Sequence, residues 1–275
     1  MPDRRINISL IFIFVCVVTI AGDPSDYLRF LLAISFALIL SYTSFVFNWL
    51  TLDGAAAASV FGTLAYGLGG NTGAAVVLIF FISGSLLSKD MVGREGFLDE
   101  KFRRNGKQVW CNGFWFAIWI IVWYATGSMI FLVAGVAAMA AANADTWATE
   151  IGGNRIKGAT RLISNWKKVE PGTDGGISLE GTIASLVGSV IIAAAFWIFN
   201  QQAGIAELTV IIISGVAGSL ADSYFGARLQ NRLFTFSNWR RRLIQELYIN
   251  NNLVNWFSTG IASLTGLILI IIAKI

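Results

Sequence analysis

Long runs of apolar residues, separated by short polar segments, make up most of this chain. The runs cover residues 6–22, 27–47 and 53–68, then a stretch that follows a Gly69-Gly70-Asn71 turn and ends near Ser88, then 110–125, 128–144, 177–199, 207–226 and 253–273. Most have the length of roughly 17–25 residues that an α-helix needs to cross a bilayer. The pattern predicts an all-α protein, a polytopic transmembrane helical bundle of about nine spans that forms a single integral membrane domain over residues 1–275.

The basic residues fall almost entirely between these runs. If the amino terminus is cytoplasmic, three cytoplasmic loops follow, at residues 89–109, 147–176 and 228–250, and of the 20 Lys and Arg residues only Arg29 and Lys274 lie on the other side. An excess of Lys and Arg is typical of cytoplasmic loops, and adding or removing one span would spoil the bias in every later loop. The sequence therefore predicts a multi-pass protein of the cell membrane with a cytoplasmic amino terminus.

The composition narrows the chemistry further. A hydrophobic content of 56% and a mean hydropathy of +0.67 exclude a water-soluble domain. The absence of histidine excludes histidine acid–base catalysis and most zinc sites, and leaves oxygen-ligated metals such as Mg²⁺. Cys16 and Cys111 are interpreted as packing residues. The net charge of +4 follows from the loops, so it does not indicate a nucleic-acid partner.

Two carboxylates stand at the end of the apolar run 128–144, where a charge in the bilayer costs roughly 2.5–3.5 kcal/mol. On a regular helix Asp145 and Thr149 share a face, whereas Glu150 lies about 140° further round. Three roles are open to Glu150: it binds a second ion, it orients a Lys or Arg side chain, or it converges with Asp145 if the helix breaks at Gly152-Gly153. Alternatively, both acids mark the membrane exit and pair with loop arginines.

A second acid lies at the corresponding end of the run 207–226. Asp222, Gly226 and Gln230 recur every four residues and form one stripe of a helix, and Ser223 follows the acid as Thr146 follows Asp145. A small-residue helix contact is the alternative interpretation, which explains the glycine but not the acid.

A glycine-rich turn opens the run 177–199, and polar side chains enter two other runs. Small residues at a helix start favour anion binding, because phosphate can reach the backbone amides there, although an ordinary turn has the same composition. Helical spacing places a polar face before the run 110–125, and amides precede the run 253–273; solvation, capping and helix–helix bonds are alternative roles. The candidate phosphate- and nucleotide-binding residues are Lys89, Arg104, Asn105, Gln108, Asn112, Thr149, Gly172, Thr173, Gly175, Gly176, Ser223, Gln230, Asn252 and Asn255.

These blocks together resemble a family of membrane proteins that includes the phytyl-phosphate kinase of the vitamin E (tocopherol) pathway. The most specific block is Ala144-Asp145-Thr146-Trp147-Ala148-Thr149-Glu150, and Arg104-Asn105, Gly175-Gly176, Asp222-Ser223 and Asn251-Asn252 occur in family order. The resemblance implies a phosphotransferase that uses a nucleoside triphosphate, CTP, to convert an isoprenyl monophosphate (phytyl or geranylgeranyl phosphate) to the diphosphate.

The residues agree with that chemistry, because a monophosphate is already an anionic nucleophile and needs no strong base. Asp145 and Asp222 are the expected Mg²⁺ ligands, assisted by Thr149 and Glu150, at the cytoplasmic face of the membrane. The prenyl chain is expected between the third, sixth and eighth spans. The alternatives are a membrane transporter or lipid flippase with acidic coupling sites, and an assembly factor without chemistry.

Overall fold

The computed structural model describes residues 2–95, 103–156, 158–238 and 243–274. Over these residues, eight helices are long and apolar enough to cross a membrane. They are α1 (Pro2–Ala21), α2 (Tyr27–Val46), α3 (Leu52–Glu95), α4 (Gly106–Thr126), α5 (Met129–Trp147), α6 (Leu179–Phe199), α7 (Ile205–Arg228) and α8 (Asn251–Lys274). The helical bundle is therefore confirmed, while the orientation in the membrane stays a prediction.

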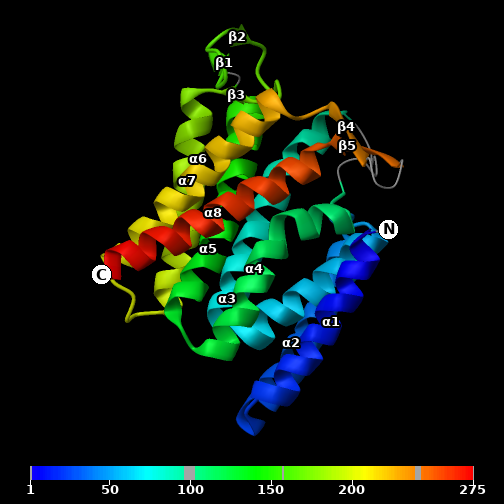
Figure 1. Cartoon of the computed structure of the whole chain (residues 1–275), viewed down its shortest axis with the longest axis vertical. Coiled ribbons are helices and arrows are strands. Elements are labelled where there is room, and N and C mark those ends of the chain that lie inside the picture. The colour runs from blue at the N-terminus through cyan, green and yellow to red at the C-terminus, as the bar shows by residue number, and fades with distance from the viewer. Residues whose placement is uncertain (1, 96–102, 157, 239–242, 275) are drawn as a thin grey trace.

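Helix α5 is the centre of the bundle (Figure 1). It contacts α3, α4, α6, α7 and α8, and every residue from Leu132 to Ala144 is buried. A helix that is apolar on all sides is typical of a buried position, and its alanines and glycine let the surrounding backbones approach closely. As a result, Asp145 at the end of α5 is placed among the other helices.

Helix α3 breaks at Gly70, whose φ of 57° and ψ of −151° are not helical. A straight helix would separate Gly54 from Gly84 by about 45 Å. Both glycines instead pack against Arg104, Gly54 against its carbonyl group and Gly84 against its guanidinium. The chain therefore reverses at the glycine turn that the sequence predicts. The sequence counts two spans, one on either side of this turn, whereas α3 is counted once among the eight candidate helices. The number of nine spans therefore stays a prediction.

The connections differ from the sequence prediction at their edges. Helix α3 extends to Glu95, and α4 begins at Gly106, so helical residues reach into the loop expected at 89–109. Helix α4 begins early because Asn105 and Gln108 form a capping box, in which each side chain accepts a hydrogen bond from the other residue's amide at 3.0 Å. At its other end, Gly127 adopts φ 67° and closes the short turn between the apolar runs 110–125 and 128–144.

Two small sheets, which the sequence did not predict, lie at one end of the bundle (Figure 1). The first has the order β2-β1-β3 and consists of β1 (Thr160–Leu162), β2 (Lys168–Val169) and β3 (Gly176–Ile177), all antiparallel. The second is the hairpin of β4 (Arg232–Asn238) and β5 (Leu243–Ile249). The strands of the first sheet are too short to show an alternating pattern in the sequence. We call this end of the molecule the sheet end.

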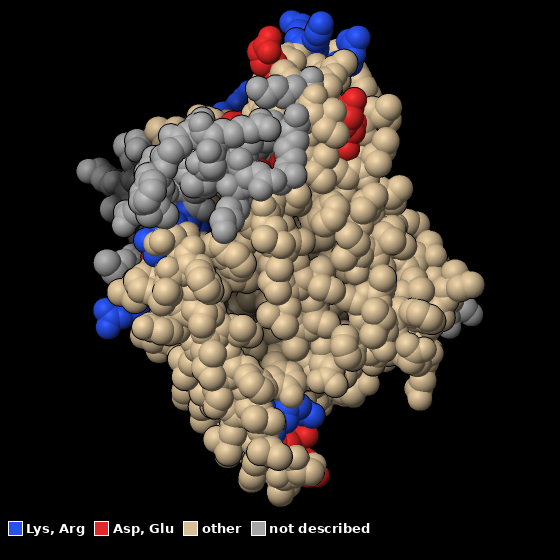
Figure 2. Space-filling view, turned by 180° about the vertical axis from the view of Figure 1, so that it is seen from behind, with Lys and Arg blue, Asp and Glu red and all other residues tan. Residues whose placement is uncertain are grey.

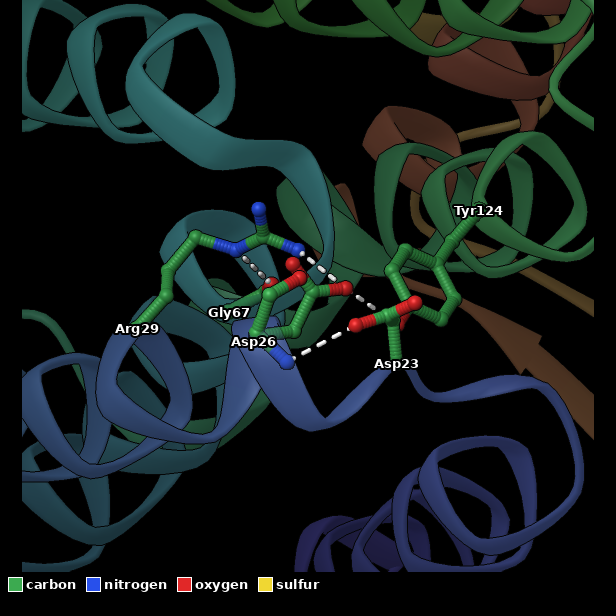
Figure 3. A network of polar contacts seen from close by, with 6 residues as sticks. Asp23, Asp26, Arg29, Gly67 and Tyr124 are labelled. Carbon is green, nitrogen blue, oxygen red and sulfur yellow. Dashed lines mark hydrogen bonds and ion pairs between the residues drawn. The ribbon is translucent and has the colours of Figure 1, made fainter.

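A polar network holds the opposite end of the bundle together (Figure 3). Arg29 forms an ion pair of 3.0 Å with Asp26 and donates through Nε to the Gly67 carbonyl at 2.9 Å. The Tyr124 hydroxyl donates to Asp26 at 2.7 Å. The network thus joins the start of α2 to α3 and to the end of α4. Figure 2 shows charged side chains gathered toward the ends and one edge of the molecule, with a broad uncharged band between them.

Candidate active site

A cavity of about 610 Å³ lies at the sheet end and is lined by residues of α3 to α8, of the connections between them and of the segment that joins α2 to α3. The lining includes most of the candidates: Asp145, Glu150, Asp222, Arg104, Gln108, Asn112, Thr149, Gly172, Thr173, Gly175, Gly176, Ser223, Gln230, Asn252 and Asn255. Asn105 is not among the lining residues, and its side chain caps α4. The side chain of Lys89 lies outside the described residues.

The carboxylates of Asp145 and Asp222 come from α5 and α7 and interact electrostatically across this cavity. Asp222 is buried, and its Oδ2 accepts a hydrogen bond of 2.9 Å from the Ser258 hydroxyl. With its amide nitrogen turned toward the neighbouring acceptors, Asn255 donates to the same oxygen at 3.1 Å. That orientation is the favourable one, because the opposite one sets an amide oxygen against a carboxylate. Two side chains of α8 therefore hold Asp222 in place.

The pair of carboxylates offers a limited set of metal ligands. In the part of the chain that the structure describes, no group of three or more acidic, cysteine or histidine side chains is placed to hold a metal ion. Mg²⁺ is commonly bound by one or two carboxylates, with water and substrate phosphates completing its shell. The carboxylate oxygens of Asp145 and Asp222 therefore fit Mg²⁺ that takes its remaining ligands from water and a bound phosphate.

Glu150 reaches the cavity because α5 does not continue as a regular α-helix. From Ala148 to Arg155 the chain forms a π-helical segment, η3, in which hydrogen bonds join residues five apart. Such widened turns bring positions five apart toward one face, and Asp145 and Glu150 both line the cavity. Gly152 allows this path, since a Cβ there would lie 2.5 Å from the Cα of Gly181 in α6. The sequence made this convergence conditional on a break at Gly152-Gly153, whereas the change of helical pitch begins at Ala148 and continues through both glycines. The chemical role of Glu150 stays a prediction.

Arg104 supplies the cavity with a positive charge that lies against apolar groups. Its guanidinium carbon is 5.0 Å from the ring centre of Phe80 and 5.9 Å from that of Phe81, and the group packs on Gly84. Burial lowers the pKa of Arg104 to about 10, although the charge of Glu150 acts in the opposite direction. The side chain is therefore cationic at neutral pH. Within the described residues its guanidinium forms no hydrogen bond and no ion pair shorter than 4.0 Å, so an anionic ligand would relieve an incompletely paired charge.

The glycine turn faces the same cavity and packs directly on α7. Gly172 and Gly175 have φ of 84° and 76°, a conformation that favours glycine. A Cβ on Gly175 would overlap the backbone of Ala227, and one on Gly226 would lie 3.1 Å from the Gly175 nitrogen. The contact explains why the stripe Asp222, Gly226 and Gln230 contains a glycine. It also joins the turn to the helix that carries the second carboxylate.

Several residues that line the cavity, or that bond to a side chain lining it, were missed by the sequence analysis. Ser88 donates to Glu150 at 2.7 Å, and Ser258 reaches Asp222 from α8. Phe47 and Trp49 line the side of the cavity next to α2. Isolated serines and aromatics in apolar runs are common in membrane helices, so their spacing carried no signal.

A bundle of apolar helices, with a cavity at one end that combines carboxylates, an arginine and a glycine turn, defines the class of protein as a polytopic integral membrane protein. The family model described as integral membrane protein DUF92 matches residues 35–263, and the chain belongs to this family.

The relatives include plant and archaeal proteins. Protein PGR of Arabidopsis thaliana is 28% identical over 236 residues, which are 76% of this chain and 81% of the relative. Protein VTE6, chloroplastic, also of Arabidopsis thaliana, is 27% identical over 230 residues, or 80% of this chain and 65% of the relative. The uncharacterized membrane protein MJ0933 of Methanocaldococcus jannaschii is 28% identical over 201 residues, or 70% and 74%. No solved structure matches the chain. The family predicted from the sequence motifs is confirmed.

Proposed function

We propose that the protein transfers the γ-phosphoryl group of a nucleoside triphosphate, CTP, to an isoprenyl monophosphate and so forms the diphosphate. The observation that carries the proposal is the meeting of Asp145, Asp222, Arg104 and the Gly172–Gly176 turn in one cavity. Membership of the family that the motifs resemble, with VTE6 among the relatives, supports it. The acceptor is a phytyl or geranylgeranyl phosphate, and the site faces the cytoplasm.

The donor phosphates belong at the glycine turn and the start of α6. Ser178 caps this helix by accepting from the Gly181 amide at 3.1 Å, and both residues line the cavity. A helix start combines free amides with a favourable dipole, which suits a triphosphate. Asp145 and Asp222 would hold Mg²⁺, which neutralises phosphate charge and orients the γ-phosphate. Both hydrogen bonds to Asp222 end on Oδ2, so Oδ1 is the oxygen available for the ion.

The acceptor phosphate belongs on the other side, at Arg104, with Gln108 beside it and Lys89 as a further candidate. An oxygen of the monophosphate attacks the γ-phosphorus, the bond from that phosphorus to the β-phosphate oxygen breaks, and the nucleoside diphosphate leaves. The attacking oxygen is already anionic, so the residues act by positioning and by neutralising charge. Thr149 and Glu150 assist near the metal, and the remaining side chains, Asn112, Ser223, Gln230, Asn252 and Asn255, contact the nucleotide.

Purified protein in detergent micelles, given γ-labelled CTP, Mg²⁺ and geranylgeranyl phosphate, should form labelled diphosphate. Asp145→Asn and Asp222→Asn keep the side-chain size but remove a metal-binding charge, so each should lower turnover by at least 100-fold, corresponding to roughly 3 kcal/mol. Asp23→Asn, an exposed acid at the opposite end of the bundle, is the matched control and should remain active. Full activity of both cavity variants would refute the metal assignment. Wild-type protein that forms no diphosphate in micelles, but moves the lipid across liposomes, would establish the transporter alternative.

A further inference from the structure

Three aromatic residues form a cluster at one side of the cavity, and the proposed phosphoryl transfer assigns them no role. Phe47 and Trp49 line the cavity, and their ring centres are 6.4 Å apart. The ring centre of Phe81 in α3 lies 5.9 Å from that of Trp49, so Trp49 contacts both of the other rings. We call Phe47, Trp49 and Phe81 the aromatic wall.

The aromatic wall is joined to the cation of the cavity. The Arg104 guanidinium lies over Phe81. The backbone of the same arginine pairs with the segment after α2: its amide donates to the Trp49 carbonyl at 2.9 Å, and its carbonyl accepts from Thr51 at 3.1 Å. Arg103 adds a bond of 2.7 Å from its guanidinium to the Leu50 carbonyl. These bonds between residues far apart in sequence therefore hold the Arg104 cation next to the aromatic wall.

The wall also leads out of the cavity. The Phe47 side chain is 69% exposed and continues the exposed apolar surface formed by Tyr42 and Val46 of α2. In a membrane such a surface faces lipid. Other parts of the lining are polar and include the backbone of the glycine turn, Gln230 and Asn252. The cavity therefore joins a polar region to an apolar exit.

We propose that the aromatic wall binds the first isoprene units of the acceptor while Arg104 holds the phosphate of the same molecule. The chain then leaves between the end of α2 and the second half of α3 and enters the bilayer. This inference rests on the proposed function for the identity of the lipid, and it replaces the path between the third, sixth and eighth spans. An anionic head group and an unsaturated tail match a cation next to aromatic faces.

Photolabelling without nucleotide tests this path. The full chain, in phosphatidylcholine nanodiscs, is irradiated with a geranylgeranyl monophosphate that carries a diazirine on its first isoprene unit, and the labelled peptides are sequenced. Label is expected on the segment 47–51 and around Phe81. Label concentrated on Thr182 or Leu220, which line the cavity from α6 and α7, would overturn the proposal. Unlabelled geranylgeranyl phosphate should compete, and equal competition by phosphatidic acid would overturn the assignment to a prenyl chain.

Substitutions distinguish specific binding at the aromatic wall from nonspecific contact with lipid. Trp49→Ala and Phe47→Ala should each reduce labelling at least threefold, and Trp49→Phe should restore most of it. Phe12→Ala is the matched control, because Phe12 has the same 69% exposure but lies on α1 and does not line the cavity. Phe47 is exposed, so its substitution tests the wall even if Trp49→Ala disturbs folding. Undiminished labelling of Phe47→Ala at the wall would contradict the proposal.

The outcomes also separate this inference from the proposed function. Labelling of the wall by protein that forms no diphosphate would refute the kinase proposal and preserve the lipid-binding path. Diphosphate formation with label on α6 or α7 would preserve the kinase proposal and refute the path.

Discussion

The glycine turn allows a test in which two substitutions of the same kind should have different effects. Gly172 and Gly175 both have positive φ, so alanine at either position costs about 1–2 kcal/mol of backbone strain. A Cβ on Gly172 meets no atom within 4 Å, whereas one on Gly175 overlaps Ala227 of α7. Overpacking of this kind costs a further 1–3 kcal/mol or so. We therefore expect a loss of about 2–5 kcal/mol for Gly175→Ala and about 1–2 kcal/mol for Gly172→Ala.

The assay is the free energy of unfolding in mixed micelles, measured with and without CTP and Mg²⁺. A ligand at 100 times its dissociation constant stabilises a protein by about 2.7 kcal/mol. The wild type and Gly172→Ala should show most of this gain. Gly175→Ala should lose most of it, because the displaced turn no longer lies beside Asp222 and Gly226. Equal stability losses in the two variants, or full stabilisation of Gly175→Ala by CTP, would refute the argument from the turn's contact with α7.

Four further predictions concern three side chains. Arg104→Met should raise the KM for the prenyl phosphate about 10–100-fold and leave the KM for CTP within threefold, because a charged hydrogen bond contributes about 1.5–3 kcal/mol. Since burial lowers the pKa of Arg104 to about 10, wild-type acceptor binding should weaken as the pH rises through 10 and the cation is lost; unchanged affinity there would contradict its role. Ser258→Ala removes the 2.9 Å bond to Asp222 and should weaken Mn²⁺ binding, measured by paramagnetic resonance with CTP present, roughly tenfold, whereas Ser263→Ala, a buried serine on the same helix, should not. Tyr124→Phe breaks the network of Figure 3 and should lower the free energy of unfolding by about 1 kcal/mol without changing KM, so a KM change would show that the two ends of the bundle are coupled.

Local patterns account for the candidate residues that the structure brings to the cavity. The recurrence of Asp222, Gly226 and Gln230 places them on one helical face, and all three line the cavity. The turn at Gly70 and the hairpin at Gly127 follow from glycine's access to positive φ. Asn105 shows the limit of such reasoning: spacing puts it with Gln108 on a polar face, but the capping box uses its side chain to begin α4.

The sequence by itself determined that the chain is an integral membrane bundle, because long apolar runs have no other stable environment. It also singled out the polar residues whose presence in those runs is costly, above all Asp145 and Asp222. Only the tertiary structure decided that Glu150 joins them through a π-helical turn, that Ser258 holds Asp222, and that Trp49 lies beside Arg104. These contacts join residues of separate helices or depend on a local change of helical pitch, and the periodicity of a single helix contains neither kind of information.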